Sequence, residues 1–328
     1  MPDPAYKGKR AGQGARLAAL SFHGARFGLA GKKSWSQRVK MIAYLSSKVT
    51  LPGSPTRRPD AFEHDRMMTA LHAPFAERGM RVVDVDWADP NQDWTRFDAA
   101  IIGTTWDYWD HKDAFLATLR AIEAVTPLFN PADLVAWNAH KGYLRDLQAR
   151  GARQIPTVWI DTVNEQTAAA AFDRLESDDL VFKRQVGAGA AGQFRLSRGE
   201  ALPHMPHPMM VQPFLQTIQS EGELSFIFID GEFCHALIKR ATAGDYRIQS
   251  AYGGVEEAIQ PSADDLAAAR AILETLDNPP LYGRVDMVRG LDGALLLMEL
   301  ELIEPYLYPL EGPDLGPRLA AAMARRIG

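Results

Sequence analysis

In the first third of the chain, short runs of apolar residues alternate with a segment whose apolar residues recur at helical spacing. Residues 42–45, 81–85 and 99–102 are short apolar runs, whereas residues 62–75 carry apolar side chains at helical spacing. Strands that alternate with helices are typical of a parallel α/β sheet. The pattern therefore predicts a small parallel α/β domain. No Gly-x-Gly-x-x-Gly follows its first strand, which argues against a dinucleotide site.

The second half of the chain shows a different pattern, in which short turns join neighbouring strands. Residues 223–229 and 232–238 are apolar and flank Asp230-Gly231, the strongest hairpin signal in the chain. Residues 295–301 follow residues 283–286 in the same way, after a Gly/Asp turn. We expect antiparallel sheets here, and hence an α+β arrangement beyond the first domain.

Charged side chains lie along one face of the last predicted hairpin. Successive side chains of a strand point to opposite faces, so Glu299 and Glu301 share one face, as do Arg284 and Asp286. Folding the strands about the turn between them places Asp286 roughly opposite Leu297 and within diagonal reach of Glu299. The sequence thus predicts three carboxylates and one guanidinium on one side of the sheet.

So many acidic groups are costly to gather unless a cation lies among them. Carboxylate oxygens suit Mg²⁺ or Mn²⁺, and Mg²⁺ commonly combines one or two carboxylates with substrate phosphates. Asp286, Glu299 and Glu301 are therefore the candidate metal ligands. The alternative is the solvated outer face of a surface hairpin, since edge strands are often charged.

Upstream segments offer groups that suit phosphate. We expect a helix to begin with Asn138 as its N-cap, which would place Lys141 in the first turn, where phosphate is favoured. Lys183 ends a short apolar strand and precedes the glycine-rich residues 187–192. A turn of this kind exposes N–H groups that can surround phosphate oxygens. Its spacing is not that of Walker A, and taken alone it also fits a mobile turn.

Residues 106–109, Trp-Asp-Tyr-Trp, follow the third predicted strand. Loops beyond the carboxyl ends of parallel strands are where such sheets bind ligands. These aromatic side chains would either line a pocket for a small molecule or pack at a domain junction, and the sequence favours neither alternative.

Composition and charge limit the class of protein. The 328 residues include a single cysteine, Cys234, which excludes an internal disulfide framework and fits a cytoplasmic location. No apolar run approaches the roughly 20 residues of a membrane span. Residues 1–40 hold nine Lys/Arg and one acidic residue, so we expect a basic, disordered extension. The remainder is more acidic than the overall net charge of −5, which argues against a general nucleic-acid binder.

The order of these features along the chain resembles the ATP-grasp superfamily, in its glutathione-synthetase-like carboxylate–amine ligase branch. The features are Lys141, Lys183, the glycine-rich residues 187–192, the hinge at 212–215, the acid Glu223, the bases Lys239, Arg240 and Arg247, and the acidic hairpin. The resemblance covers residues 41–328. The Trp-Asp-Tyr loop, the Trp-Asn…Lys segment at 137–141 and the Glu-Leu-Glu-Leu-Ile-Glu-Pro run at 299–305 look most like the cycloserine synthetase group, the O-ureido-serine cyclo-ligases.

The resemblance implies an ATP-grasp fold of class α/β (α+β), in which an N-terminal parallel α/β domain precedes two α+β lobes that clamp ATP. It implies a pre-ATP-grasp domain at 41–135, a small lobe at 136–210 and a large lobe with the metal hairpin at 211–328. It also agrees with metal ligation by Asp286, Glu299 and Glu301.

Further residue roles follow from the same resemblance. Arg247 would contact the γ-phosphate or the acceptor carboxylate, Arg284 would stabilise the tetrahedral intermediate, and Lys239 would add a catalytic cation. The nucleotide would be bound by two lysines, the glycine loop, hinge groups at the adenine and an acid at the ribose: Lys141, Lys183, Gly187, Gly189, Gly192, Gln212, Phe214, Leu215 and Glu223.

Two positions depart from the family pattern. Glu301 stands where the branch more often has asparagine, and a third carboxylate should still bind Mg²⁺. Gly103 stands where the cycloserine synthetase group has an arginine before the aromatic loop. The second departure leaves the identity of the substrate open.

The implied activity is that of an ATP-dependent ligase that forms C–N bonds with ATP and Mg²⁺ (or Mn²⁺). A small carboxylic acid would become an acylphosphate and react with an amine-type nucleophile, within one molecule in cycloserine formation. The alternatives are an amino-acid ligase acting on peptide or protein termini and a nucleotide-binding module without turnover. We expect neither nucleic acid nor membrane as a partner, and a homo-oligomer stays open.

Overall fold

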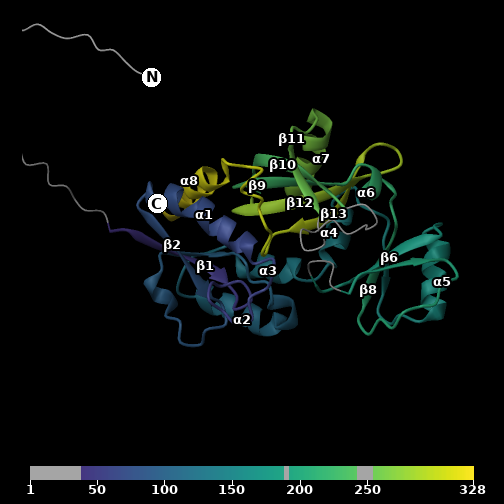
Figure 1. Cartoon of the computed structure of the whole chain (residues 1–328), viewed down its shortest axis with the longest axis horizontal. Coiled ribbons are helices and arrows are strands. Elements are labelled where there is room, and N and C mark those ends of the chain that lie inside the picture. Colours follow the sequence, from purple (N-terminus) through teal and green to yellow (C-terminus); the bar gives the residue numbers. More distant parts are fainter. Residues whose placement is uncertain (1–37, 188–191, 242–253) are drawn as a thin grey trace, which may run out of the picture. The chain divides into compact units, whose positions relative to one another are not determined.

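The computed structural model describes residues 38–187, 192–241 and 254–328. Arg247 and Gly189, two of the predicted site residues, lie outside these ranges. The described residues form three sheets with helices packed against them (Figure 1), as expected for a mixed α/β protein. No helix in the described ranges is both long and apolar enough to cross a membrane.

The first sheet is parallel, as the alternating pattern predicted, with strand order β2-β1-β3-β4. Strand β1 lies between β2 and β3, and its Ile42 and Leu45 are completely buried. The aromatic loop follows the carboxyl end of β3. The elements of this part are β1 (Lys40–Ser46), α1 (Phe62–Ala76), β2 (Met80–Asp86), η1 (Trp94–Arg96), β3 (Ala99–Ile102), η2 (Tyr108–Asp110), α2 (Lys112–Glu123) and β4 (Leu128–Phe129).

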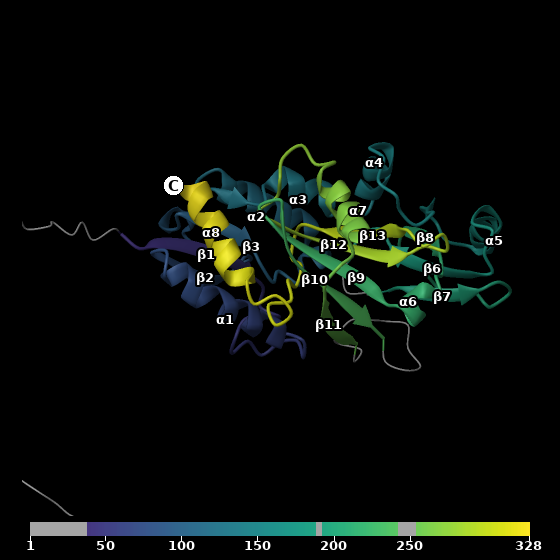
Figure 2. The same cartoon turned by 90° about the horizontal axis from the view of Figure 1, so that it is seen from above.

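The second sheet is antiparallel, with strand order β11-β10-β9-β12-β13. Asp230 and Gly231 join β9 to β10 with φ of 56° and 78°, which confirms the predicted hairpin. Helix α7 packs against β12 and β13 through Ala269 and Ile272 (Figure 2). The elements are β9 (Glu223–Ile229), β10 (Glu232–Arg240), β11 (Val255–Ile259), α7 (Ala263–Leu273), β12 (Tyr282–Arg289) and β13 (Leu295–Glu301).

The third sheet is antiparallel, with strand order β5-β8-β6-β7. Its β6 and β7 pair directly, so the glycine-rich segment joins two antiparallel strands, as predicted. Strand β8 spans residue 210, where the boundary between the two lobes was inferred, and the domain boundaries stay a prediction. The elements are β5 (Val158–Ile160), α5 (Glu165–Arg174), β6 (Asp179–Arg184), β7 (Phe194–Ser197) and β8 (Met209–Pro213).

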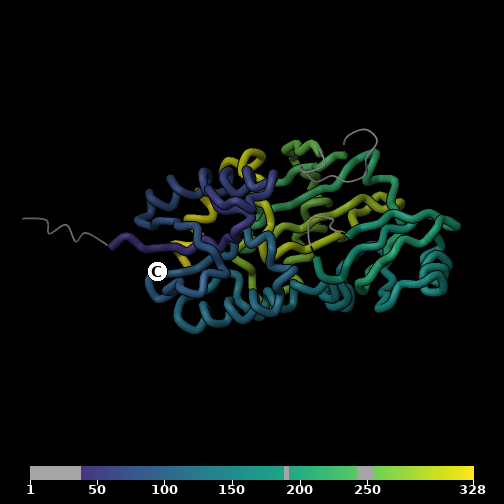
Figure 3. Tube along the Cα trace, turned by 60° about the horizontal axis from the view of Figure 1, so that its bottom comes forward, coloured from purple at the N-terminus to yellow at the C-terminus, as the bar shows by residue number. Residues whose placement is uncertain are grey.

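The C-terminal helix α8 (Leu315–Ile327) returns to the first domain and packs against α1, so the yellow end of the chain lies beside the purple and blue segments in Figure 3. A Cβ at Gly316 would lie 2.1 Å from the Ala70 carbonyl oxygen, so glycine permits this close approach of the two helices. The remaining helices are α3 (Ala132–Asn138), α4 (Tyr143–Ala149) and α6 (Thr217–Ser220).

Two asparagines fasten the segment after the first sheet to strand β13 and the residues around it. Asn130 Nδ2 donates to the Leu302 carbonyl oxygen (2.8 Å), and its Oδ1 accepts from the Leu281 N–H (2.8 Å). Asn138 Nδ2 donates to the Leu300 carbonyl oxygen (2.9 Å), and its Oδ1 accepts from the Leu302 N–H (3.1 Å). These buried bonds hold the first domain against the acidic hairpin.

Candidate active site

The β12–β13 hairpin carries the predicted charged residues on one face, but in a different register from that expected. Asp286 pairs with Glu299 and Arg284 pairs with Glu301, whereas the sequence had placed Asp286 opposite Leu297. A β-bulge directly after Asp286 adds one residue on the β13 side. The expected register is therefore wrong, and the bulge turns a diagonal relation between Asp286 and Glu299 into a direct pair.

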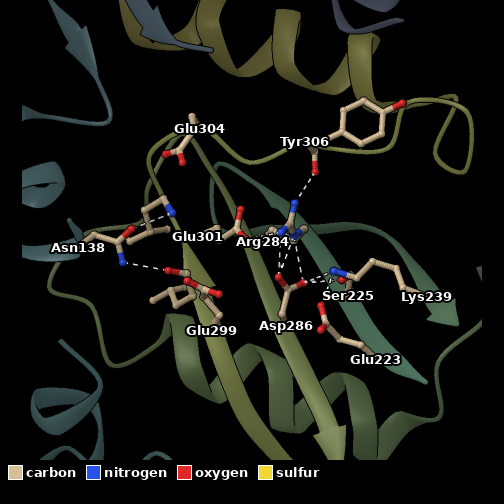
Figure 4. Close-up of polar contacts among 12 residues, drawn as sticks. Asn138, Glu223, Ser225, Lys239, Arg284, Asp286, Glu299, Glu301, Glu304 and Tyr306 are labelled. Atoms are coloured by element: carbon tan, nitrogen blue, oxygen red, sulfur yellow. Dashed lines mark hydrogen bonds and ion pairs between the residues drawn. The ribbon is translucent and has the colours of Figure 1, made fainter. Parts of the chain in front are cut away.

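Arg284 forms the centre of the charged network on this face (Figure 4). Its Nε lies 3.0 Å from both carboxylate oxygens of Asp286, its Nη1 donates to the Tyr306 carbonyl oxygen (2.9 Å), and its Nη2 contacts Glu301. Burial lowers the pKa of Arg284, but the carboxylates of Asp286 and Glu301 outweigh this effect and raise it well above its usual value. The guanidinium is thus held in place and remains charged.

Lys239 on β10 supplies a second buried cation. Its Nζ forms an ion pair with Glu223 and lies 3.4 Å from Asp286 Oδ1. Burial would raise the pKa of Asp286, but Arg284 and Lys239 outweigh it and hold that pKa at about 2. Burial raises the pKa of Glu223, against the charge of Lys239. One lysine therefore contacts both the predicted ribose acid and a predicted metal ligand.

Lys141 contacts Glu299, so the first predicted phosphate lysine meets the acidic face. It does not lie in the first turn of a helix, because α3 ends at Asn138 and α4 begins at Tyr143. The prediction that Asn138 is an N-cap is wrong, since its side chain bonds to the backbone of the β13 segment instead. The Lys141 N–H donates to the Gln185 carbonyl oxygen (2.8 Å), which places Lys141 beside the end of β6.

Lys183, the second predicted phosphate lysine, lies on β6 within reach of the same charges. Burial lowers the pKa of Lys183, the Glu299 carboxylate opposes this shift, and the Lys141 ammonium adds to it. A bound anion would favour the charged form of Lys183. The structure thus gathers both lysines and Glu299 in one region.

The predicted adenine segment lies at and beyond the end of β8. Gln212 is buried within the third sheet. The Phe214 N–H donates to the Asp179 carbonyl oxygen (2.8 Å), and the Leu215 carbonyl oxygen accepts from the Ile218 N–H (3.0 Å). Two backbone groups of this segment are therefore already bonded within the protein, and its contact with adenine stays a prediction.

A pocket opens beside the charged face, between the aromatic loop and β13. Residues that line it include Tyr108, Lys141, Gly187, Glu299, Glu301 and Glu304. Gly187 and Gly192 are the described members of the predicted loop glycines, with φ of 151° and 67°.

The aromatic loop contributes both to a pocket and to core packing, the two alternatives that the sequence left open. Tyr108 lines the pocket. Trp106 packs in the hydrophobic core instead, and its Nε1 donates to the Glu304 carbonyl oxygen (3.1 Å). No pattern in the sequence predicts that Tyr108 and Glu304 share a pocket, because they come from distant segments and Glu304 lies beyond the alternating residues of β13.

Burial shifts the titration of two pocket acids. It raises the pKa of Glu301, Arg284 opposes the shift, and Asp286 and Glu299 add to it, with a result of about 7. Burial also raises the pKa of Glu304 well above its usual value, and Glu301 adds to that shift. A cation placed among these groups would lower both pKa values.

The donor atoms of this face fit a hard cation such as Mg²⁺, because Asp286, Glu299 and Glu301 offer carboxylate oxygens side by side. Arginine and lysine side chains contact all three acids. In the described ranges, no group of three or more His, Cys, Asp or Glu side chains is arranged to hold a metal ion by itself. The acids would therefore need further ligands, such as phosphate oxygens, to complete a magnesium site.

Glycine at position 103 is explained by the packing of the core. A Cβ at this position would lie 2.1 Å from Tyr44 Cε1, and Tyr44 is buried on the neighbouring strand β1. The ring of Tyr44 thus occupies the space that a side chain at residue 103 would need.

Comparison with known proteins agrees with this arrangement. A family model for the N-terminal domain of D-cycloserine synthetase DcsG matches residues 42–130. The cycloserine biosynthesis protein DcsG of Streptomyces lavendulae is 32% identical to this chain over 261 residues, which are 74% of this chain and 87% of that protein. The chain belongs to the cycloserine synthetase family of ATP-grasp ligases. It is an ATP-dependent ligase, as the order of its motifs indicated.

Solved structures show the same architecture as this cycloserine synthetase family member. The crystal structure of D-cycloserine synthetase DcsG matches with a TM-score of 0.74 at 28% identity, over 88% of this chain and 100% of that chain. The ATP-grasp ligase PsnB, complexed with a phosphomimetic variant of its minimal precursor, Mg and ADP, matches with a TM-score of 0.60 at 16% identity, over 89% and 100%. The second likeness concerns the fold alone. The predicted ATP-grasp fold is thereby confirmed.

Proposed function

We propose that this ligase activates a small carboxylic acid as an acylphosphate, which an amine-type nucleophile then captures. The observation that supports this is the contact between Lys141 and Glu299 at a pocket that Glu301 also lines. Phosphoryl transfer depends on positioning and on neutralisation of charge more than on covalent help from the protein. A pocket that gathers cations and carboxylates meets that need.

We assign the phosphates of ATP to Lys141 and Lys183, covered by the glycine loop of Gly187, Gly189 and Gly192. Glu223 is assigned to the ribose, and the segment from Gln212 to Leu215 to the adenine. Asp286, Glu299 and Glu301 would hold Mg²⁺ (or Mn²⁺) together with phosphate oxygens. When bound, Mg²⁺ neutralises the charge that develops on the transferring phosphoryl group.

The chain's own cations would act at two points of the reaction. In the first step, a carboxylate oxygen of the substrate takes the γ-phosphoryl group and ADP leaves. In the second step, the nitrogen attacks the acyl carbon and phosphate leaves. Arg284 is held by Asp286 and the Tyr306 carbonyl oxygen, so it would stabilise the oxyanion with little rearrangement. Lys239 maintains the charge of this network, and Arg247 is assigned to the γ-phosphate or the acceptor carboxylate.

We further propose that the carboxylate and the nucleophile belong to one molecule, so that the product forms by ring closure. The cycloserine biosynthesis relative supports this, because the match covers 87% of that protein. An O-ureido derivative of serine is the candidate substrate. A small-molecule substrate, without nucleic acid as a partner, agrees with the acidic composition of residues 41–328. A cytoplasmic location agrees with the single cysteine, Cys234.

The experiment that tests this function is ADP release by the full-length chain with MgATP across a substrate panel. The panel holds amino acids, O-ureido-serine, hydroxylamine derivatives and short peptides. We expect ADP with O-ureido-serine, together with a cyclised product in the mass spectrum. ADP with peptide acceptors only would favour a peptide-directed amino-acid ligase. Binding of ATP without ADP release from any member of the panel would refute the ligase proposal.

A further inference from the structure

Tyr108 and Glu304 line the same pocket from opposite ends of the chain. Tyr108 is only 5% exposed, and its ring packs on Phe115 with a centroid distance of 5.2 Å. The carboxyl group with the largest electrostatic effect on its hydroxyl is that of Glu304. Among the described residues, the Tyr108 hydroxyl has no hydrogen-bond partner, and the Glu304 carboxyl group accepts only from its own backbone N–H.

The charge balance of the pocket distinguishes Glu304 from its acidic neighbours. Glu299 is paired with Lys141, and Glu301 is paired with Arg284. In the part of the chain that the structure describes, Glu304 has no such cation. A carboxylate can accept several hydrogen bonds, and Glu304 accepts only from its own N–H among the described residues. Buried polar groups in proteins are nearly always partnered, so this carboxyl group and the Tyr108 hydroxyl together indicate a ligand that supplies hydrogen-bond donors.

We propose that Tyr108 and Glu304 form a receptor for a primary ammonium group of the acceptor substrate. This inference rests on the proposed function, because it describes part of the substrate of that reaction. An ammonium group has three donors and one positive charge, whereas the carboxylate of Glu304 and the phenolic oxygen of Tyr108 both accept. A charge-assisted hydrogen bond of this kind is stronger than one between neutral groups.

The bound ammonium group is a recognition group and not the nucleophile. A carboxylate partner favours the protonated form of an amine, and a protonated nitrogen has no lone pair with which to attack. The acceptor is therefore an amino acid that presents its α-ammonium group to Tyr108 and Glu304, while a different nitrogen reacts. A compound without that amino group would leave the carboxylate unpaired, which is a strong basis for discrimination.

Equilibrium binding to the full-length chain tests this receptor without requiring turnover. Calorimetry with Mg²⁺ and a non-hydrolysable ATP analogue would compare O-ureido-serine with 3-(ureidooxy)propanoate, the same molecule without its α-amino group. We expect the amine to bind at least about tenfold more tightly. Glu304→Gln should reduce the ratio of the two affinities towards one, while its affinity for the ATP analogue stays within about twofold of the wild-type value.

Two further variants separate recognition from folding. Tyr108→Phe keeps the packed ring and removes the hydroxyl, so it should weaken the preference even if Glu304→Gln proves unstable. Asp110→Asn changes an exposed acid of the same loop and should leave the preference unaltered. Glu304→Gln also keeps the backbone carbonyl that accepts from Trp106.

The outcomes distinguish this receptor from the ligase proposal. Three results would overturn the receptor: equal affinities of the wild type for the two compounds, no binding of O-ureido-serine, or a preference that survives in both Glu304→Gln and Tyr108→Phe. ADP release without a preference for the amine would overturn the receptor alone. A preference that depends on Glu304, without ADP release from any substrate, would support the receptor and refute the ligase.

Discussion

Lys141 and Glu299 form an ion pair across the pocket, although 158 residues separate them in the sequence. The lysine comes from the segment between α3 and α4, and the glutamate from β13. Because the two groups neutralise each other, the pocket can hold both without ligand. In the proposed complex, phosphate would bind Lys141 and Mg²⁺ would bind Glu299. A substitution at Glu299 should therefore have a large effect on activity.

Glu299→Gln is expected to abolish ADP release with little effect on folding. The substitution removes a proposed Mg²⁺ ligand, so the loss should exceed the roughly 10–100-fold typical of residues that only support such ligands. The side chain of Glu299 is 34% exposed, and the loss of its ion pair should cost at most about 1 kcal/mol. Steady-state ADP release and thermal unfolding measure the two effects. Asp292→Asn, in the turn of the same hairpin, is the matched control, and near-normal turnover of Glu299→Gln would contradict the metal assignment.

Lys239→Met is expected to lower the free energy of unfolding by about 3–5 kcal/mol, because it leaves the buried carboxylates of Glu223 and Asp286 without their ammonium partner. Urea denaturation measures this change. The double variant with Glu223→Gln should recover part of the loss, since one uncompensated charge is then removed. An unchanged unfolding free energy would show that Lys239 does not stabilise the folded state.

Gly103→Ala should destabilise the protein by about 1–3 kcal/mol, because the added Cβ would collide with the ring of Tyr44. Tyr44→Leu should be destabilising by itself, through the cavity that it leaves. In the double variant the total loss of unfolding free energy should be smaller than the sum of the two single losses, since the smaller side chain makes room for the Cβ. Urea denaturation of all four proteins measures this coupling, and strict additivity would contradict the steric explanation.

Deletion of residues 1–37 should leave ADP turnover unchanged, because the proposed site residues all lie within 103–304. Deletion of residues 1–40 should in addition lower the melting temperature. Arg38 contacts Asp98 (3.0 Å), and Lys40 opens β1 and donates to the Ile327 carbonyl oxygen (3.1 Å). Turnover and thermal unfolding of both shortened chains test this boundary. A large loss of turnover in the shorter deletion would show that the basic segment takes part in the reaction.

The sequence by itself determined the kinds of elements and the faces on which charges lie. Period-two alternation placed Arg284 with Asp286 and Glu299 with Glu301, because successive side chains of a strand must point in opposite directions. Asp230-Gly231 predicted its hairpin because a tight turn requires residues that tolerate positive φ. Local geometry of this kind is fixed by neighbouring residues, so it can be inferred without the fold.

Only the tertiary structure decided how distant segments meet. The bulge after Asp286 changes which residue opposes it, and nothing in the sequence marks that extra residue. The side chain of Asn138 satisfies the backbone of the β13 segment instead of capping a helix, and Tyr108 meets Glu304 in a pocket. These relations depend on how whole elements pack, and packing depends on side chains far apart in the chain that local pattern cannot relate.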